Sequence, residues 1–256
     1  MLLFFCKMKN KWLFLFLGVF ISLMLINFGL MAQNLRIEGV GPNIRGKTLR
    51  LIMVSDNLSG LETEIESYKV GKDDSIFSFS TTIANTSLMK IRIESFDFNF
   101  IAKMGSSYKM RILPFNFNVS DTVNTLFYKF PLPIIIDNST DDKINNKVYV
   151  IDSVIEDYML KNERDILFFR DKTKVMALKD IMDMVVDSND SKYVKDYAKY
   201  SIGMIEFSSK TVNETKLKAE LFFNKPILYD NLAYMDCFEM VYGDYFTKGN
   251  KIFDKI

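Results

Sequence analysis

Histidine is absent from this 256-residue chain, and its absence limits the chemistry that the other side chains can do. Without an imidazole, neither a Ser-His-Asp nor a Cys-His catalytic group can form, and a His-ligated metal site cannot form either. Residues 187–191 begin like a calcium loop, but Lys192 stands where that loop needs glycine and Ala198 where it needs a bidentate glutamate. We expect a helix-to-helix turn there, and the sequence predicts no catalytic residue, no cofactor and no metal.

Two strings, residues 87–90 and 106–109, match the Ser-x-x-Lys motif of penicillin-recognising enzymes. That chemistry requires the serine and the lysine to face each other across one helical turn. Both strings lie where apolar and polar residues alternate, and in a strand two residues three apart point to opposite faces. We reject both matches. The alternative that stays open for an enzyme is a carboxylate-dependent hydrolase of an envelope glycan, which needs two acids across a cleft.

Cys237 is a candidate free thiol, because Cys6 lies in the N-terminal segment and no second cysteine is present in the body of the chain. One cysteine cannot close an intramolecular disulfide, and a CxxC pair is absent. The simplest interpretation of Cys237 is a small buried hydrophobe on a helix, since free cysteines are usually buried. The alternative is a reactive thiol that forms a mixed disulfide with a redox partner.

A tyrosine stripe at helical spacing is the candidate partner surface, since tyrosine offers an apolar ring and a hydrogen-bonding tip. It comprises Tyr193, Tyr197, Tyr200 and Tyr234. The competing interpretation is a seam between helices, because periodic apolar positions usually belong to a core.

Composition restricts the class of partner. The 33 Lys and Arg residues balance 32 Asp and Glu residues, for a formal net charge of +1. Nucleic-acid binders need a clustered basic excess, so we expect no nucleic-acid partner. The hydrophobic content is 48% and the aromatic content 14%, which predicts a folded body rather than a disordered chain.

The N-terminus has the pattern of an export signal. Lys7, Lys9 and Lys11 precede an apolar run over residues 12–32 that ends in Ala32 and is followed by polar residues. We expect residues 1–32 to be a signal peptide, or else an uncleaved N-terminal anchor, since about 20 apolar residues can span a bilayer. Either alternative carries the body across the membrane, to the periplasm or outer envelope. Membrane contact is then expected only through this segment, if it is uncleaved.

Two halves follow, and the fold class that we predict is α+β. In residues 33–136, apolar and polar residues alternate, as in 89–93, 96–100 and 108–112, which predicts an antiparallel β-sandwich. Prolines 131 and 133 and the polar run 137–142 end that pattern. From residue 141 to 256, apolar residues recur three and four positions apart, which predicts a helical bundle with stripes at 144–159, 175–186, 193–207, 217–222 and 234–245.

The order of these parts resembles the non-catalytic N-terminal region of Gram-negative envelope thioredoxin-like disulfide reductases. The residues that carry the resemblance are 36–39, 47–51 and 75–79 in the β half, and 193–200, 224–235 and 241–246 in the helical half. In that family, a thioredoxin domain with CxxC follows and reduces disulfides. No such motif is present here, so the resemblance implies an accessory module and transfers no catalytic residue.

These observations together predict an exported, non-catalytic binding or accessory protein of the bacterial envelope, with a protein or peptide partner. Association with thiol-disulfide systems is what the resemblance implies.

Overall fold

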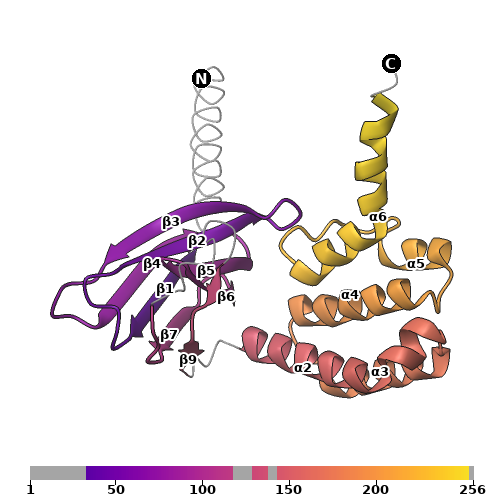
Figure 1. Ribbon diagram of the computed structural model, residues 1–256, viewed down its shortest axis with the longest axis horizontal. Coiled ribbons are helices and arrows are strands. Elements are labelled where there is room, and N and C mark those ends of the chain that lie inside the picture. The colour runs from indigo at the N-terminus through magenta and orange to yellow at the C-terminus, as the bar shows by residue number, and fades with distance from the viewer. Residues whose placement is uncertain (1–32, 118–128, 138–142, 254–256) are drawn as a thin grey trace, which may run out of the picture.

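The computed structural model describes residues 33–117, 129–137 and 143–253, and it confirms an α+β chain in which strands are followed by helices (Figure 1). The predicted signal peptide, residues 1–32, lies outside the described residues. Strands occupy the described part up to Ile136, and helices occupy the part from Lys143 onward.

The strands form two sheets. One has the order β4-β1-β7-β9, with bounds Ile76–Ile83, Gln33–Val40, Ser107–Ile112 and Ile134–Ile136. The other has the order β3-β2-β5-β6-β8, with bounds Leu61–Lys69, Thr48–Asp56, Ser87–Ile93, Phe96–Ala102 and Phe130–Pro131.

Both sheets are mixed rather than purely antiparallel, which corrects one detail of the prediction. β1 pairs with β7 in parallel, and β6 pairs with β8 in parallel, while the other pairs are antiparallel. The parallel pairs join strands that are distant in the sequence. Alternation identifies which residues face the core, but it carries no information about which strand becomes the neighbour.

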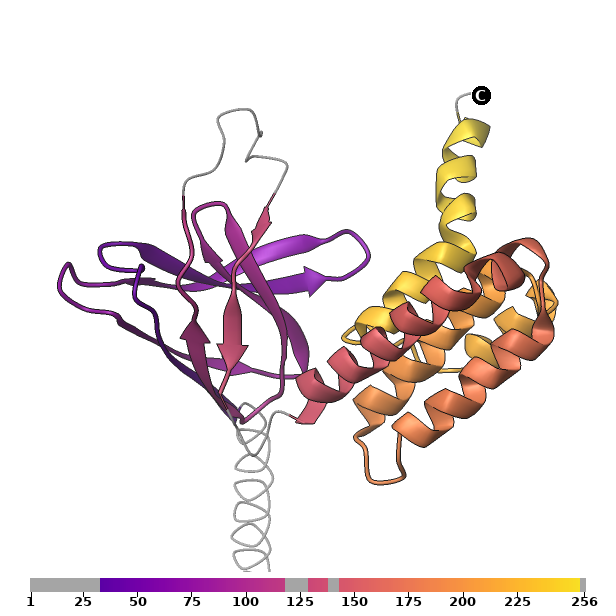
Figure 2. The same cartoon turned by 60° about the horizontal axis from the view of Figure 1, so that its bottom comes forward.

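One apolar core lies between the two sheets, as the turned view in Figure 2 helps to follow. Alternate residues of β1, β4 and β7 meet alternate residues of β2, β5 and β6 there. The hydroxyl of the buried Tyr108 is satisfied within this core, since it accepts from Lys103 N at 2.9 Å and lies 3.3 Å from Ile101 O. Period-two burial in β5 and β7 therefore confirms the sandwich expectation.

The helical half consists of α2 (Lys143–Glu163), the π-helical turn η1 (Arg164–Phe168), α3 (Lys172–Val185), α4 (Lys192–Ser209), α5 (Glu214–Leu221) and α6 (Leu232–Phe253). Each α-helix corresponds to one predicted stripe. Side chains cap four of the starts by accepting from free backbone amides: Asp171, Ser191, Asn213 and Asn231. The central helix is α4, which contacts α2, α3, α5 and α6.

The two halves meet where α2 begins beside β6. Asn145 pairs with the backbone of Ile101 in both directions, because Ile101 N donates to Asn145 Oδ1 at 2.7 Å and Asn145 Nδ2 donates to Ile101 O at 2.9 Å. The Ile101 side chain is buried among the helices rather than between the sheets. A second contact is the 2.9 Å hydrogen bond from Asn57 Nδ2 to Tyr229 O.

Among the described residues, no helix combines the length and apolar character needed to cross a membrane.

Candidate functional site

A groove of about 610 Å³ lies between α3, α4 and α5, and we call it the helical groove. Its apolar lining consists of Met182, Val186, Ala198, Ile202 and Leu221. Its polar and charged lining consists of Lys179, Asp183, Asp187, Ser188, Lys195, Lys199, Glu206 and Glu220. An apolar floor bordered by charged groups is typical of a ligand site, where burial supplies affinity and a few polar groups fix orientation.

Glu206 is a buried carboxylate in the lining of this groove, and its side chain is only 9% exposed. Lys179 of α3 donates to it, which compensates the cost of burying the charge. The pair joins α3 to α4 across the groove. Glu206 is thus a paired, structural acid.

Lys199 is placed differently, because its ammonium group lies beside that of Lys225. Burial, and then the second ammonium group, lower the pKa of Lys199 below its usual value. The carboxylate whose charge acts on Lys199 is Asp196, and it hydrogen-bonds Lys192 at 2.7 Å. Lys199, with Lys225 beside it, makes this part of the groove attractive to an anionic group.

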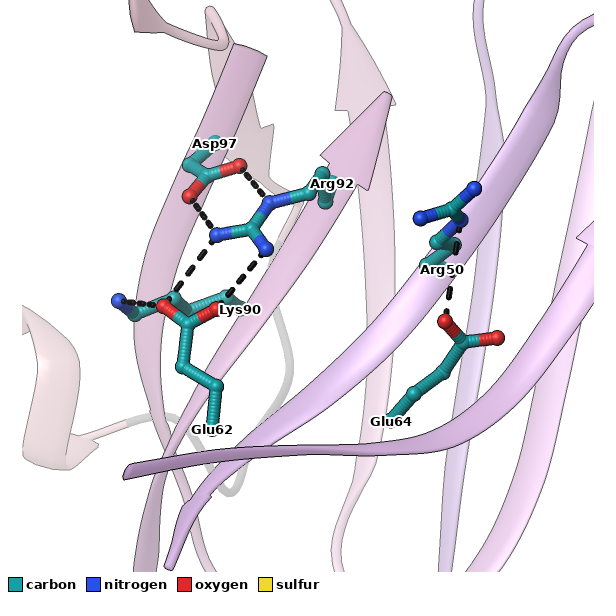
Figure 3. Close-up of polar contacts among 6 residues, drawn as sticks. All are labelled: Arg50, Glu62, Glu64, Lys90, Arg92 and Asp97. Atoms are coloured by element: carbon teal, nitrogen blue, oxygen red, sulfur yellow. Dashed lines mark hydrogen bonds and ion pairs between the residues drawn. The ribbon is translucent and has the colours of Figure 1, made fainter. Parts of the chain in front are cut away.

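A second concentration of charge, the charged strip, lies on the outer face of the larger sheet and consists of Glu62, Lys90, Arg92 and Asp97 (Figure 3). Arg92 Nε and Nη2 donate to Asp97 at 2.7 and 2.6 Å, and Arg92 Nη1 donates to Glu62 at 2.8 Å. Lys90 donates to Glu62 at 2.6 Å. Beside the strip, Arg50 and Glu64 lie 3.7 Å apart.

The charged strip does not resemble the paired acids of a glycan hydrolase. Such an enzyme needs one carboxyl group that stays protonated, which requires a raised pKa. Here burial tends to raise the pKa of Glu62, but hydrogen bonds from Arg92 and Lys90 outweigh it and lower that pKa overall. Both acids of the strip are ion-paired with the same guanidinium, so no observation here favours the hydrolase.

The tyrosine stripe does not form an exposed surface, which corrects the candidate partner surface. Tyr197, Tyr200 and Tyr234 are buried in the helical core, and Tyr193 is half-buried against it. The rings of Tyr200 and Tyr234 meet edge to face with centroids 4.7 Å apart. The tyrosine rings lie in the seam between α4 and α6, because burying their apolar surface stabilises the bundle.

Two hydroxyls of the stripe are also engaged. Tyr200 donates to Leu221 O at 3.1 Å, and Tyr197 donates to Asp152 at 3.0 Å. Burial raises the pKa of Asp152. These contacts tie α4 to α5 and to α2, so the stripe supports the scaffold behind the helical groove.

Cys237 is a free but fully buried thiol in α6. Burial, and secondarily the charges of Asp236 and Glu206, raise its pKa to about 12. A thiol in this state neither forms thiolate at neutral pH nor meets a partner. The structure therefore gives no support to a mixed disulfide through Cys237.

Sequence reasoning missed the helical groove and the charged strip. A signal for the groove was present in α4, where Ala198, Ile202 and Glu206 recur at intervals of four on a face separate from the tyrosine stripe.

Across the described ranges, no cluster of three or more acidic or cysteine side chains is arranged to hold a metal ion.

Comparisons with known proteins add little. No protein-family model matches the chain, and no curated protein is similar to it. Among solved structures, an NMR structure of a protein from Eubacterium rectale aligns at 13% identity over 44% of this chain and 96% of its own. The TM-score is 0.25, which is too low to show a shared fold.

Proposed function

We propose that this chain is an exported, non-catalytic protein of the bacterial envelope that binds a segment of a partner protein in the helical groove. The observation that carries the proposal is the groove itself, with its apolar floor and the neighbouring ammonium groups of Lys199 and Lys225. A peptide that places an apolar side chain on the floor and a carboxylate near Lys199 satisfies both features.

The non-catalytic part of the proposal is supported by the state of the reactive groups. The chain has no histidine, the thiol of Cys237 is buried, and Glu62 shares Arg92 with Asp97. The thiol is engaged in packing, and the carboxylates are engaged in ion pairs. Association with a thiol-disulfide system is therefore proposed to be non-covalent and to avoid Cys237.

Peptide binding tests the groove. The probes are a short fluorescein-labelled peptide with a leucine flanked by glutamates, and a second peptide in which lysines replace the glutamates. Fluorescence anisotropy of the purified protein is expected to detect binding of the acidic peptide and not of the basic one. Lys199→Glu should weaken binding at least about tenfold, since like charges then face each other.

The matched control is Lys69→Glu, which reverses an exposed charge on β3, outside the groove. It should leave the affinity unchanged. Equal loss in both variants, or no binding of the acidic peptide, would contradict the proposed site.

Export is tested separately with a reporter. Residues 1–32 fused to alkaline phosphatase, which needs an oxidising compartment to form its disulfides, should give active enzyme in a Gram-negative host. Replacing Lys7, Lys9 and Lys11 with glutamate should reduce that activity, because the basic residues orient the segment. An inactive parent fusion would count against export.

A further inference from the structure

Large apolar side chains are exposed at the end of the helical half where α2 turns into α3. Phe168 is 83% exposed and Phe169 is 66% exposed, and Leu160 and Met176 on the flanking helix turns are exposed as well. We call these four residues the aromatic tip. In Figure 2 this turn lies at the end of the helices remote from the sheets. A contiguous exposed apolar patch bordered by polar residues marks an interaction surface.

The local structure of the turn keeps the side chains of the aromatic tip exposed. Ile166 of the π-helical turn is fully buried and anchors it, and Asp171 N donates to Asp165 O at 2.9 Å to close it. Arg170, directly after the phenylalanines, has a left-handed backbone with φ of 55°, which is unfavourable for a residue with a side chain. π-helical turns are rare and occur frequently at functional sites.

Basic residues are frequent in the segment that carries the tip. Residues 160–176 contain five basic residues against three acidic ones, and the basic ones are Lys161, Arg164, Arg170, Lys172 and Lys174. Asp171 is occupied within the turn, because it accepts from Thr173 N at 2.8 Å. The guanidinium of Arg164 lies over the Phe169 ring at 5.4 Å from its centroid. The segment that carries the tip therefore combines exposed apolar side chains with an excess of basic residues.

We propose that the aromatic tip inserts into the surface of an anionic lipid membrane. Aromatic and aliphatic side chains bury in the boundary between headgroups and acyl chains, while lysine and arginine pair with anionic headgroups. This contact is additional to the N-terminal segment and separate from the helical groove, whose occupancy it does not require.

The test uses the full chain with Trp12→Phe, which removes the only tryptophan, and adds Phe168→Trp as the reporter. Vesicles contain phosphatidylglycerol and phosphatidylcholine with brominated acyl chains. The emission of the new tryptophan is expected to shift to the blue and to be quenched. Both effects should be lost with phosphatidylcholine alone and at high salt, because salt screens the attraction.

The matched control is Phe223→Trp in the same background, since Phe223 is similarly exposed, at 71%, but lies after α5. Its emission should stay unquenched, although the N-terminal segment is common to both proteins. Lys161→Glu with Lys172→Glu should abolish the quenching at position 168. Unquenched emission at position 168 would overturn the proposal in favour of a protein partner, and equal quenching at position 223 would overturn it as unspecific adsorption.

Discussion

At the scale of single residues, Arg92 and Cys237 show how burial decides between chemistry and structure. Arg92 binds two carboxylates at once, and its own pKa is raised by hydrogen bonds with Asp97, so the guanidinium stays charged. Cys237 has the opposite environment, since burial holds its sulfur in the neutral form. For Cys237 the residue type suggested reactivity, and the surroundings remove it.

Glu62 is expected to stabilise the fold in a pH-dependent way. Its pKa is lowered in the folded state, so its contribution is present above the unfolded pKa of about 4.3 and is lost as pH falls through the folded pKa. Glu62→Gln should therefore lower the free energy of unfolding by about 1–2 kcal/mol at neutral pH, allowing for solvent screening. The difference should shrink below about pH 4.

Urea denaturation over this pH range measures the effect, with Glu64→Gln as the control. Within the described part of the chain, Glu64 pairs with exposed Arg50 alone, at 3.7 Å, so its replacement should change stability little. Equal effects of both substitutions at neutral pH would contradict the role given to Arg92.

Cys237 is expected to be unreactive in the native protein. In a Cys6→Ser background, a thiol-specific reagent at neutral pH should label Cys237 only after denaturant is added, because the thiol is buried and its pKa is about 12. The readout is mass spectrometry of the labelled protein. Complete labelling without denaturant would show that α6 opens readily and would reinstate the redox hypothesis.

At the scale of elements, close packing of α4 against α5 and α6 shapes the helical groove. Gly203 permits this approach, since a Cβ built there would lie 2.7 Å from Leu221 Cδ1 and 3.4 Å from Cys237 Sγ. Leu221 also lines the groove floor. A side chain at position 203 must displace the Leu221 side chain.

Gly203→Ala is therefore expected to destabilise the protein relative to Gly243→Ala by about 1–3 kcal/mol. Gly243 lies inside α6, where a Cβ would be 4.0 Å from the nearest atom, Glu239 Cγ. Both substitutions gain the same helix propensity, so that gain cancels in the comparison. Thermal denaturation measures the difference, and a Gly203→Ala protein as stable as the Gly243 variant would contradict the packing described.

Local periodicity predicted most elements, because each stripe or alternation is set by residues close in sequence. The stripes at 175–186 and 193–207 became α3 and α4. The parallel pairing of β1 with β7 was not predictable, since it depends on contacts between distant segments. The groove was not predictable either, because Lys179, Lys199 and Leu221 come from three helices whose packing no local pattern encodes.

At the scale of the whole molecule, polar contacts among the described residues connect the two halves. Asn145 is central, since its side-chain amide satisfies both backbone groups of Ile101. Ile101 thus belongs to a strand by its backbone and to the helical core by its side chain.

Asn145→Ala is expected to loosen this connection, at a cost of about 1–3 kcal/mol for the unsatisfied N–H of Ile101, since Ile101 O still accepts from the Tyr108 hydroxyl. Amide hydrogen exchange at Ile101 should accelerate, because its N–H loses its partner. Asn146→Ala, an exposed neighbour on the same helix, is the control and should leave exchange unchanged. Unaltered exchange at Ile101 in the Asn145 variant would show that the halves are joined by other contacts.

The central claim is that this protein acts by binding in the helical groove, and methyl NMR of methionine-labelled protein tests it most directly. Met182 lies on the groove floor, while Met184 on the same helix is exposed and does not line the groove. Titration with the acidic peptide is predicted to shift the Met182 methyl signal and leave that of Met184 in place, with the shift lost in Lys199→Glu. An unchanged Met182 signal at saturating peptide would contradict the account.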